Sequence, residues 1–481
     1  MKEQDYIAFH AISLEDKTWM EQRFKESGLK ACEFFFVNNF IWRRVYQLEV
    51  AQIYGCGVCR YKNNGVTIYS YPFGIGDRKK AIEKLWKICK IEKRKLCFYP
   101  IVEEQREELI AWFPGKFEID TDRDDFDYIY TSEKLTQLKG KKLHGKRNHI
   151  ARFKDTADWS YEPITQENRM ECLKVAELWR ERREKKWNSG MQQEMDALQD
   201  ALEYFQELGL SGGMLRKAGE IVAFTIGEPL NSDTFVVHFE KALPDIQGAY
   251  SMINQQFVLH AGKGFSYINR EEDMGDLGLR KAKLSYYPDI LLKKYYAAES
   301  DIVFAHNGEK EQILKIWEKC FGDDEKNIRF YLENWFSQEN MLVIHEDGKI
   351  VSMASFLPAE LVFHGKLFSA RYVYAVATLP EYRGRGYAAK ILTHSQEKYR
   401  MPLFLQPESE NLEEYYKKIG FISEFSGIRQ EGEPKEQEKI VFEEFSSMLW
   451  LPEKEEFVER EDILNEADAV IYGCAKNSGR L

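Results

Sequence analysis

The chain has 481 residues, 44% of them apolar and 31% charged, which indicates a folded protein with room for roughly two to four domains. Its net charge of −11 excludes an overall basic surface for nucleic acid. No run approaches the roughly 18 apolar residues that cross a bilayer, and the N-terminus lacks the apolar segment of a signal peptide. We therefore expect a cytoplasmic protein without a membrane span, whose oligomeric state the sequence leaves open.

Residues 1–130 carry a pattern of short strands and two helices. One strand is expected near each of Val50–Cys59, Val66–Tyr71 and Leu96–Tyr99. The helices are expected at Lys79–Lys90 and Glu103–Trp112.

Two of the eight cysteines in the chain, Cys56 and Cys59, have Cys-x-x-Cys spacing. A structural zinc site needs a second pair or nearby histidines, and the sequence offers neither. We therefore expect buried free thiols and no metal.

A basic segment, Lys139–Lys154, opens the next stretch and is predicted to form a helix that bears Lys146, Arg147, His149 and Arg152. Eight elements are then expected in the order helix, helix, three strands, helix, strand, helix. They are Leu173–Trp187, Met195–Leu208, Gly213–Arg216, Ile221–Gly227, Thr234–Phe239, Tyr250–Ala261, Phe265–Asn269 and Gly278–Leu284.

The pattern is clearest in the last third of the chain, where two helices precede a strand hairpin turned by Asp347-Gly348. The expected elements are Glu309–Cys320, Ile328–Phe336, Met341–His345, Ile350–Leu357, Leu367–Ala377, Gly386–Tyr399, Leu403–Gln406, Asn411–Ile419 and a strand from Phe421. A short helix is also predicted near Glu461–Ala469 in an acidic tail.

A strand in this region leads through a glycine-containing loop onto a helix. The loop carries Arg383, Gly384 and Gly386, and it has neither the Gly-Lys-Ser/Thr of a Walker loop nor Rossmann spacing. Glycines let backbone N–H groups approach phosphate oxygens, and the helix dipole favours negative charge. The sequence therefore predicts an anion site at this turn.

The segment resembles the Arg/Gln-x-x-Gly-x-Gly/Ala loop of GNAT (Gcn5-related) N-acetyltransferases, with Arg383, Gly386 and Ala388 at the fixed positions. The resemblance implies that the pyrophosphate of acetyl-CoA binds the loop residues. It also implies that a splayed strand holds pantetheine and the thioester. The implied cofactor residues are Ala375, Val376, Ala377, Arg383, Gly384, Arg385, Gly386, Tyr387, Ala388 and Asn411.

Further downstream, Asn411–Phe421 is similar to the Asn-x-x-x-x-Tyr-x-x-x-Gly-Phe segment of that family. The similarity implies that Tyr416 protonates the coenzyme A thiolate, and a phenol with a pKa of about 10 suits this role. Segments at Ile316–Asp323 and Ala375–Gly384 are similar to the Eis-like branch, which acetylates amines. The implied acceptor is a small-molecule or peptide amine. No spacing selects a general base among Glu360, Glu381 and Glu408.

The same order of elements is visible upstream without the motif. The loop Glu240–Gly248 has one glycine and no matching arginine, and Gly74–Asp77 adds an acid. Internal repetition of GNAT-like units is thus a hypothesis based on element order. In that case the two upstream copies have lost acetyl-CoA or never bound it.

A second resemblance rests on Lys142–Phe153, Asn269–Asp273 and Gly278–Tyr286, which look like the C-terminal domain of phosphatidylglycerol lysyltransferases. It covers roughly residues 1–298 and implies two GNAT-like folds. Lys146, Arg147, His149 and Arg152 can hold phosphates of an aminoacyl-tRNA, while Asn148 and His149 position an ester carbonyl. Lys283 is a further candidate.

Two other interpretations of this region stay open. The basic helix can be a solvated surface helix, and the N-terminal unit can be a non-catalytic platform for substrate binding or dimerisation.

The sequence thus predicts an α/β (α+β layered) protein of repeated GNAT-like acyl-CoA N-acyltransferase folds, with mixed, mostly antiparallel sheets flanked by helices. The predicted domains are residues 1–130, a degenerate GNAT-like subdomain; 131–298, a second one with the basic helix; 300–450, an acetyl-CoA-dependent GNAT domain; and 451–481, a C-terminal tail. The predicted activity is N-acetylation by the third domain, with aminoacyl-tRNA-dependent transfer by the first two as the alternative.

Overall fold

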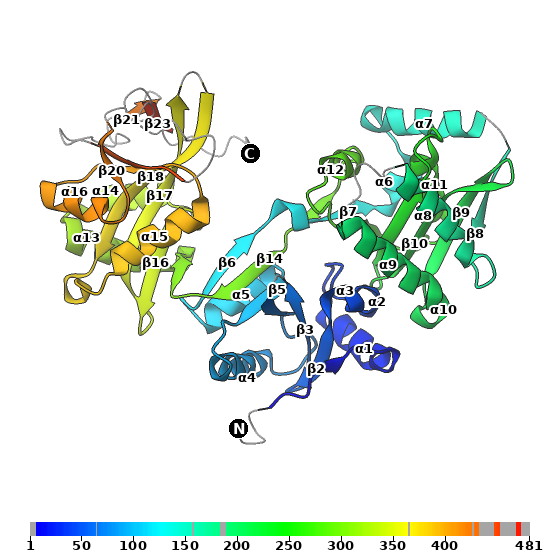
Figure 1. Ribbon diagram of the computed structural model, residues 1–481, viewed down its shortest axis with the longest axis horizontal. Coiled ribbons are helices and arrows are strands. Elements are labelled where there is room, and N and C mark those ends of the chain that lie inside the picture. Colours follow the sequence, from blue (N-terminus) through cyan, green and yellow to red (C-terminus); the bar gives the residue numbers. More distant parts are fainter. Residues whose placement is uncertain are drawn as a thin grey trace. The chain divides into compact units, whose positions relative to one another are not determined.

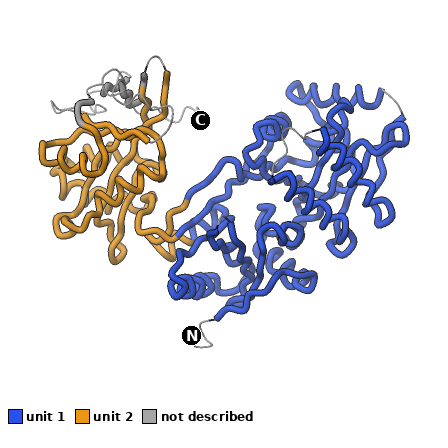
Figure 2. The backbone as a smooth tube through the Cα atoms, viewed as in Figure 1, with its two compact units in different colours: residues 1–108, 120–298 blue, residues 109–119, 299–481 orange. Residues whose placement is uncertain are grey.

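The computed structural model describes residues 6–63, 65–155, 158–182, 189–363, 366–425, 428–431, 447–452 and 468–472. It divides into two compact units, coloured separately in Figure 2. Unit 1 comprises residues 1–108 and 120–298, and unit 2 comprises residues 109–119 and 299–481.

Figure 1 labels most strands of the first sheet. Its strands, in order across the sheet, are β1 (His10–Ala11), β2 (Glu49–Ile53), β3 (Cys56–Asn63), β4 (Val66–Tyr69), β5 (Cys97–Ile101), β14 (Tyr295–Glu299) and β6 (Phe117–Thr121). The helices of this part of the chain are α1 (Lys17–Ser27), α2 (Phe36–Ile41), α3 (Arg43–Tyr46), α4 (Arg78–Ile91) and α5 (Glu103–Trp112). Strands β4 and β5 are parallel, and α4 joins them.

The second sheet belongs to unit 1. Its strands, in order, are β13 (Ile290–Leu292), β7 (Asp127–Thr131), β12 (Tyr267–Asn269), β11 (Thr234–Ala242), β10 (Glu220–Pro229), β9 (Ser211–Lys217) and β8 (Trp159–Pro163). The helices are α6 (Ser132–Gln137), α7 (His144–Asp155), α8 (Cys172–Glu181), α9 (Ser189–Glu203), α10 (Phe205–Leu208), α11 (Ala249–His260) and α12 (Leu277–Leu284). Strands β11 and β12 are parallel and are joined by α11.

The third sheet lies in unit 2. Its strands, in order, are β15 (Ile302–Phe304), β16 (Met341–Glu346), β17 (Lys349–Phe363), β18 (Lys366–Thr378), β19 (Leu403–Leu405), β22 (Ser447–Trp450) and β20 (Ile422–Phe425). Two further strands belong to the same sheet: β23 (Asp468–Tyr472) pairs with β17, and β21 (Ile428–Glu431) pairs with β23. The helices are α13 (Lys310–Phe321), α14 (Glu325–Asn334), α15 (Tyr387–Tyr399) and α16 (Glu410–Lys417). Strands β18 and β19 are parallel and are joined by α15.

The three sheets share one strand order, with an inserted strand between the fifth and the last. In the third sheet this strand is its own β22, which lies between β19 and β20. In the first and second sheets, the inserted strand comes from the chain segment that adjoins the other sheet. Strand β14, which follows the second sheet in sequence, pairs with β5 of the first, whereas β7 lies between β12 and β13. The predicted boundary at residue 130 therefore falls within a strand of the second sheet.

A buried ion cluster fixes this exchange at Lys294, the residue before β14. The Lys294 side chain is fully buried, and its amine lies 2.9 Å from Asp127 of β7, 2.7 Å from Glu33 and 3.2 Å from Glu272. Burial alone would lower the pKa of Lys294, but the surrounding carboxylates raise it above its usual range. The second oxygen of Asp127 accepts from the backbone N–H of Cys32 and from Asn269, each at 2.9 Å. Four distant chain segments thus meet at one ammonium group.

Sequence patterning located most of the long elements. Helices α4, α5, α7, α11, α13, α14, α15 and α16 and strands β9–β12 and β16–β20 overlap their predicted ranges. The fold class is confirmed, because mixed, mostly antiparallel sheets are flanked by helices in the described parts of the chain. None of the described helices is long and apolar enough to cross a bilayer.

The structure corrects two details. The region Val50–Cys59 is a hairpin of β2 and β3, which turns at Tyr54-Gly55 with φ of +48° and +79°. The helix predicted near 461–469 falls largely outside the described residues, and its last two positions, Asp468 and Ala469, lie in β23. That strand pairs antiparallel with β17, so part of the predicted tail belongs to the third sheet. Cys56 and Cys59 are buried free thiols, as predicted.

Replacing Lys294 by Met should destabilise the protein by about 3–5 kcal/mol, because it leaves buried carboxylates without their cation. Adding Asp127→Asn should recover part of that loss. Urea unfolding measures both. As a control, Lys417→Met on the exposed face of α16, where the lysine pairs with Glu413 and Glu414, should change stability by less than about 1 kcal/mol. Equal stability of Lys294→Met and wild type would contradict the anchoring role.

Candidate active site

The loop between β18 and α15 presents a helix N-terminus to solvent. Gly384 and Gly386 have φ of +79° and +77°, where side chains are strained. A Cβ added to either glycine would have no heavy atom within 4 Å, so the loop is open on that side. Gly386 is the N-cap of α15 and provides no side-chain hydrogen bond to its first turn. Such a terminus combines N–H donors with the helix dipole, which favours an anion.

Two arginines add positive charge to this loop. The Nε of Arg383 donates to the backbone oxygen of Thr378 at 3.2 Å, and no carboxylate of the described residues forms an ion pair with it. Arg385 lies 3.2 Å from Glu346, which also accepts from the Tyr387 hydroxyl. Glu346 ends β16 and has no motif spacing that would have marked it in the sequence. It is an acid that a bound anion would have to displace from Arg385.

The strand before the loop is interrupted by a bulge. Met353 pairs with Ala377 and Ser355 pairs with Tyr374, so β18 has one more residue than β17 between these pairs. Ala375 has a φ of +52°, which is unusual for a residue with a side chain. Strand β18 pairs with β19 at Arg371 and Tyr372 but, within the described residues, not beyond. The two parallel strands therefore separate at the bulge, where Ala375, Val376 and Ala377 lie.

The two tyrosines of α16 differ in their surroundings. Tyr416 is 7% exposed and packs near Phe421. Its hydroxyl has no hydrogen-bond partner among the described residues. Burial raises the pKa of Tyr416. The Tyr415 oxygen accepts from the backbone N–H of Ala389 in the first turn of α15, a contact that opposes the rise of its pKa on burial. Asn411 is exposed in the first turn of α16.

The structure does not identify a general base among the three carboxylates near the motifs, which are Glu360, Glu381 and Glu408. Glu381 forms an ion pair with Lys319 at 2.9 Å, and both are about half exposed. Glu408 is exposed, and Glu360 lies within β17. Neither the ion pair of Glu381 nor the exposure of Glu408 singles out one of the three as the base.

The equivalent helix N-termini of the other two sheets are filled by the protein itself. In the first, Asp77 caps α4 by accepting from the N–H of Lys80 at 3.0 Å. A Cβ on Gly76 would lie 2.4 Å from the backbone carbon of Gly55, so the β2–β3 turn covers this loop. In the second, a Cβ on Gly248 would lie 2.1 Å from the His149 backbone oxygen, because α7 packs against α11. The α15 terminus is the open one of the three.

The basic helix α7 uses part of its charge internally. Arg147 donates to the backbone oxygens of Leu138 and Gly140, the latter at 2.9 Å. Asn148 contacts the ring of His144 at 3.2 Å. His149 and Arg152 are exposed, whereas Lys146 points to a different, half-buried position beside Tyr286. The predicted phosphate contacts therefore do not form one cluster.

Lys283 has a structural position. Its amine is buried and donates to the backbone oxygens of Arg270 at 2.6 Å, Glu271 at 3.2 Å and Glu272. These bonds hold together the turn that follows β12. The lysine therefore does not face solvent with the cations of α7.

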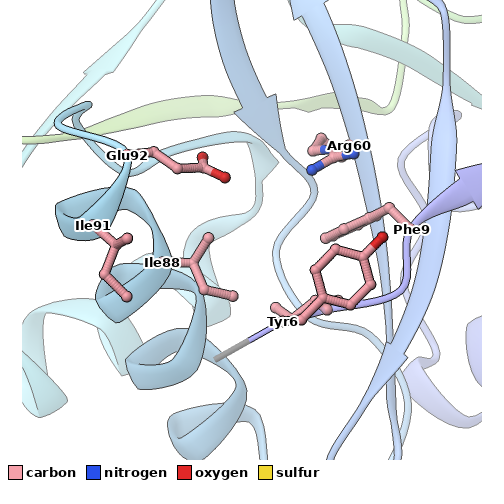
Figure 3. Close-up of a pocket in the computed structure, with 7 residues that line it drawn as sticks. Tyr6, Phe9, Arg60, Ile88, Ile91 and Glu92 are labelled. Atoms are coloured by element: carbon pink, nitrogen blue, oxygen red, sulfur yellow. The ribbon is translucent and has the colours of Figure 1, made fainter. Parts of the chain in front are cut away.

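A pocket of about 50 Å³ lies in unit 1 between the N-terminal segment and α4 (Figure 3). Phe9, Ile88 and Ile91 supply apolar walls, and Arg60 and Glu92 supply charges. Arg60 stacks 4.1 Å from the Phe9 ring. Because cofactor sites enclose about 300–1,000 Å³, this pocket is too small to hold a nucleotide cofactor.

The family matches divide the chain after residue 298, where unit 1 also ends, although residues 109–119 of unit 2 fall within the first match. Residues 25–298 match the family described as phosphatidylglycerol lysyltransferase, C-terminal, and residues 301–422 match the acetyltransferase (GNAT) domain. The first match covers more than half of the chain.

Two solved structures and one curated relative each match part of the chain. A conserved protein of unknown function from Bacteroides thetaiotaomicron VPI-5482 is 40% identical with a TM-score of 0.59, covering 61% of this chain and 100% of that one. L-PGS from Bacillus licheniformis is 16% identical with a TM-score of 0.38, covering 51% of this chain and 81% of that one. An uncharacterized protein of Mycoplasmoides gallisepticum is 24% identical over 195 residues, 39% of this chain. The chain spans 60% of the length of that curated relative.

Proposed function

Because the chain belongs to the phosphatidylglycerol lysyltransferase C-terminal family and carries a GNAT acyltransferase domain, we propose that unit 2 transfers an acetyl group from acetyl-CoA to an amine. The acceptor is a small-molecule or peptide amine. The observation that carries this proposal is the open, glycine-turned N-terminus of α15 beside Arg383. Acetyl-CoA supplies an activated thioester when it is bound.

Residues of the loop would bind the pyrophosphate. First-turn N–H groups of α15 from Tyr387 and Ala388 would donate to phosphate oxygens, and Gly384 and Gly386 keep side chains out of their way. Arg383 is held on the chain by Thr378 and by the Cys320 thiol, and it has no carboxylate partner among the described residues, so its guanidinium can still donate to a phosphate. Arg385 would exchange Glu346 for the ligand, since an exposed ion pair is worth little.

The bulge of β18 and the tyrosine of α16 would serve the transfer step. Backbone N–H groups near Val376 and Ala377 lie where the parallel strands separate, so they can donate to pantetheine and to the carbonyl oxygen. Tyr416 would give its proton to the departing thiolate. The raised pKa of Tyr416 keeps the phenol protonated at neutral pH, as a general acid requires.

Titration calorimetry with acetyl-CoA tests the loop. Arg383→Ala should raise the dissociation constant about tenfold or more, the loss of a charge-assisted hydrogen bond. Glu346→Gln should lower it by roughly two- to fivefold, because the competing acid is removed. Lys319→Ala, an exposed lysine beside the loop that pairs with Glu381, should leave it unchanged. Absence of binding to wild type, or equal binding by Arg383→Ala, would refute the site.

Steady-state kinetics on an amine substrate test the acid. Tyr416→Phe should lower kcat by about 100-fold or more with little change in KM, because proton transfer contributes about that much to a rate. Tyr415→Phe is the matched control, one residue away on the same helix, and should retain most of the rate. The reverse ranking of the two variants would transfer the acid role to Tyr415.

A second candidate, aminoacyl transfer from tRNA by unit 1, is favoured by the exposed cations of the α7 segment. Lys141, Lys142 and Arg152 are exposed there and can neutralise phosphates without a base-specific contact. The family match of residues 25–298 is consistent with this chemistry. A platform without its own chemistry remains the alternative for this unit.

Filter binding of bulk tRNA at increasing salt tests this candidate. Affinity should fall steeply with salt, and changing Lys141, Lys142 and Arg152 to Ala should lower the slope of log K against log salt by about one per lost contact. Arg147→Ala should lower the free energy of unfolding and leave the salt slope nearly unchanged, because Arg147 donates to backbone oxygens. Salt-independent binding would leave α7 as a structural helix.

A further inference from the structure

A polar cluster in unit 1 lies where the parallel strands of the second sheet separate. Strands β11 and β12 pair as far as Val236 and Asn269. Arg270 follows directly after β12, and Glu240 lies further along β11. Asn254 of α11 and Lys146 of α7 reach the same place. The position corresponds to the bulge region of unit 2, but side chains occupy it here.

Glu240 is the centre of this cluster. One of its oxygens accepts from Arg270 at 2.8 Å, and the other accepts from the amide nitrogen of Asn254 at 3.2 Å. The side chains of Arg270 and Glu240 are 11% and 10% exposed. Asn254 is 2% exposed. The amide orientation of Asn254 is fixed by this contact, because its oxygen would otherwise face a carboxylate.

Two buried polar atoms of the cluster have no hydrogen-bond partner. They are Nη1 of Arg270, a donor, and Oδ1 of Asn254, an acceptor. Buried polar atoms are normally paired, and each exception requires an explanation. A group that pairs with Arg270 Nη1 must accept a hydrogen bond, and a group that pairs with Asn254 Oδ1 must donate one.

The cluster also has an excess of positive charge. The Lys146 amine lies 4.0 Å above the Tyr286 ring, and the Arg270 guanidinium lies 5.2 Å from the same ring. Within the described residues Lys146 forms no ion pair with a carboxylate. Burial, followed by the charge of Arg270, lowers the pKa of Lys146 to about 8. Two cations thus share one carboxylate, Glu240.

We propose that this cluster binds a small carboxylate whose neighbouring carbon carries a hydrogen-bond donor, the chemistry of an α-hydroxy or α-amino acid. The carboxylate accepts from Arg270 Nη1 and from the Lys146 amine, and it supplies the missing negative charge. The hydroxyl or ammonium group donates to Asn254 Oδ1. Water would satisfy the two unpartnered atoms but would leave the charge excess in place. This inference is independent of acetyl transfer by unit 2.

Calorimetry on the full chain tests the proposal with four probes: glycolate, glycine, acetate and glycinamide. Glycolate and glycine should bind. Acetate should bind about tenfold more weakly, because it has no donor for the buried amide oxygen. Glycinamide has no anionic carboxylate and should bind at least tenfold more weakly than glycine. Equal binding of acetate and glycolate, or of glycinamide and glycine, would overturn the recognition scheme, and no saturable binding of any probe would overturn the site.

A matched pair of variants locates the binding. Lys146→Met keeps the stem over Tyr286 and should weaken glycolate binding about tenfold or more. Lys142→Met is the control, because Lys142 lies 5.0 Å over the neighbouring Tyr287 ring but is exposed. Competitive acylation of wild type followed by peptide mass spectrometry gives a second measurement. Glycolate should raise the apparent pKa of Lys146 and slow its acylation, whereas Lys142 should not respond. Identical responses of the two lysines would refute the proposal.

Discussion

The contact between Lys294 and Asp127 is the constraint on which the arrangement of unit 1 depends. Strands β7 and β14 each pair in the sheet that lies further from them along the chain, and these two residues join their ends. A buried ammonium is costly unless carboxylates surround it, so the chain segments that carry Asp127, Glu33 and Glu272 must meet at Lys294. Neither half of unit 1 can complete its sheet alone. Any activity of residues 1–298 therefore belongs to both halves together.

The same strand–helix–strand element is used differently in the three sheets. Each sheet has a parallel pair joined by one helix: α4, α11 or α15. A helix N-terminus needs partners for its first N–H groups. The chain supplies a carboxylate at α4 through Asp77 and covers α11 with α7. At α15 it supplies neither, and two arginines lie beside the open turn. This difference in side chains, and not in fold, distinguishes unit 2 as the proposed cofactor site.

Local features of the sequence predicted local structure well. The positive φ at Gly384 and Gly386 and the helix start at Tyr387 follow from neighbouring residues, so the loop was predictable. The strands β14 and β15 were missed, because each is short and its pairing partner is far along the chain. Lys294 was missed as well, since nothing near it in the sequence indicates that Asp127 will be beside it.

From residue type alone, we predicted phosphate contacts for basic side chains that the structure uses to bind backbone oxygens. Arg147 and Lys283 stand in basic patterns typical of phosphate contacts, yet both donate to backbone oxygens. A sequence cannot show that a carbonyl lies within reach, because that depends on how distant turns pack. Asn254 lies in no motif, and Arg270 lies in the motif Asn269–Asp273 without a role assigned to it. Both became candidates only through the buried atoms that they leave without partners.

Three buried or half-buried lysines of unit 1 illustrate how an ammonium can be accommodated. Lys294 is compensated by carboxylates, and Lys283 is compensated by backbone oxygens. Lys146 has an aromatic ring beneath it and an arginine beside it, and the nearest acid, Glu240, is already bound to Arg270 and Asn254. Since a desolvated cation without an anion destabilises the fold, the first two are accounted for by the protein itself. The third has no ion pair with a carboxylate among the described residues, and the proposed external anion would supply one.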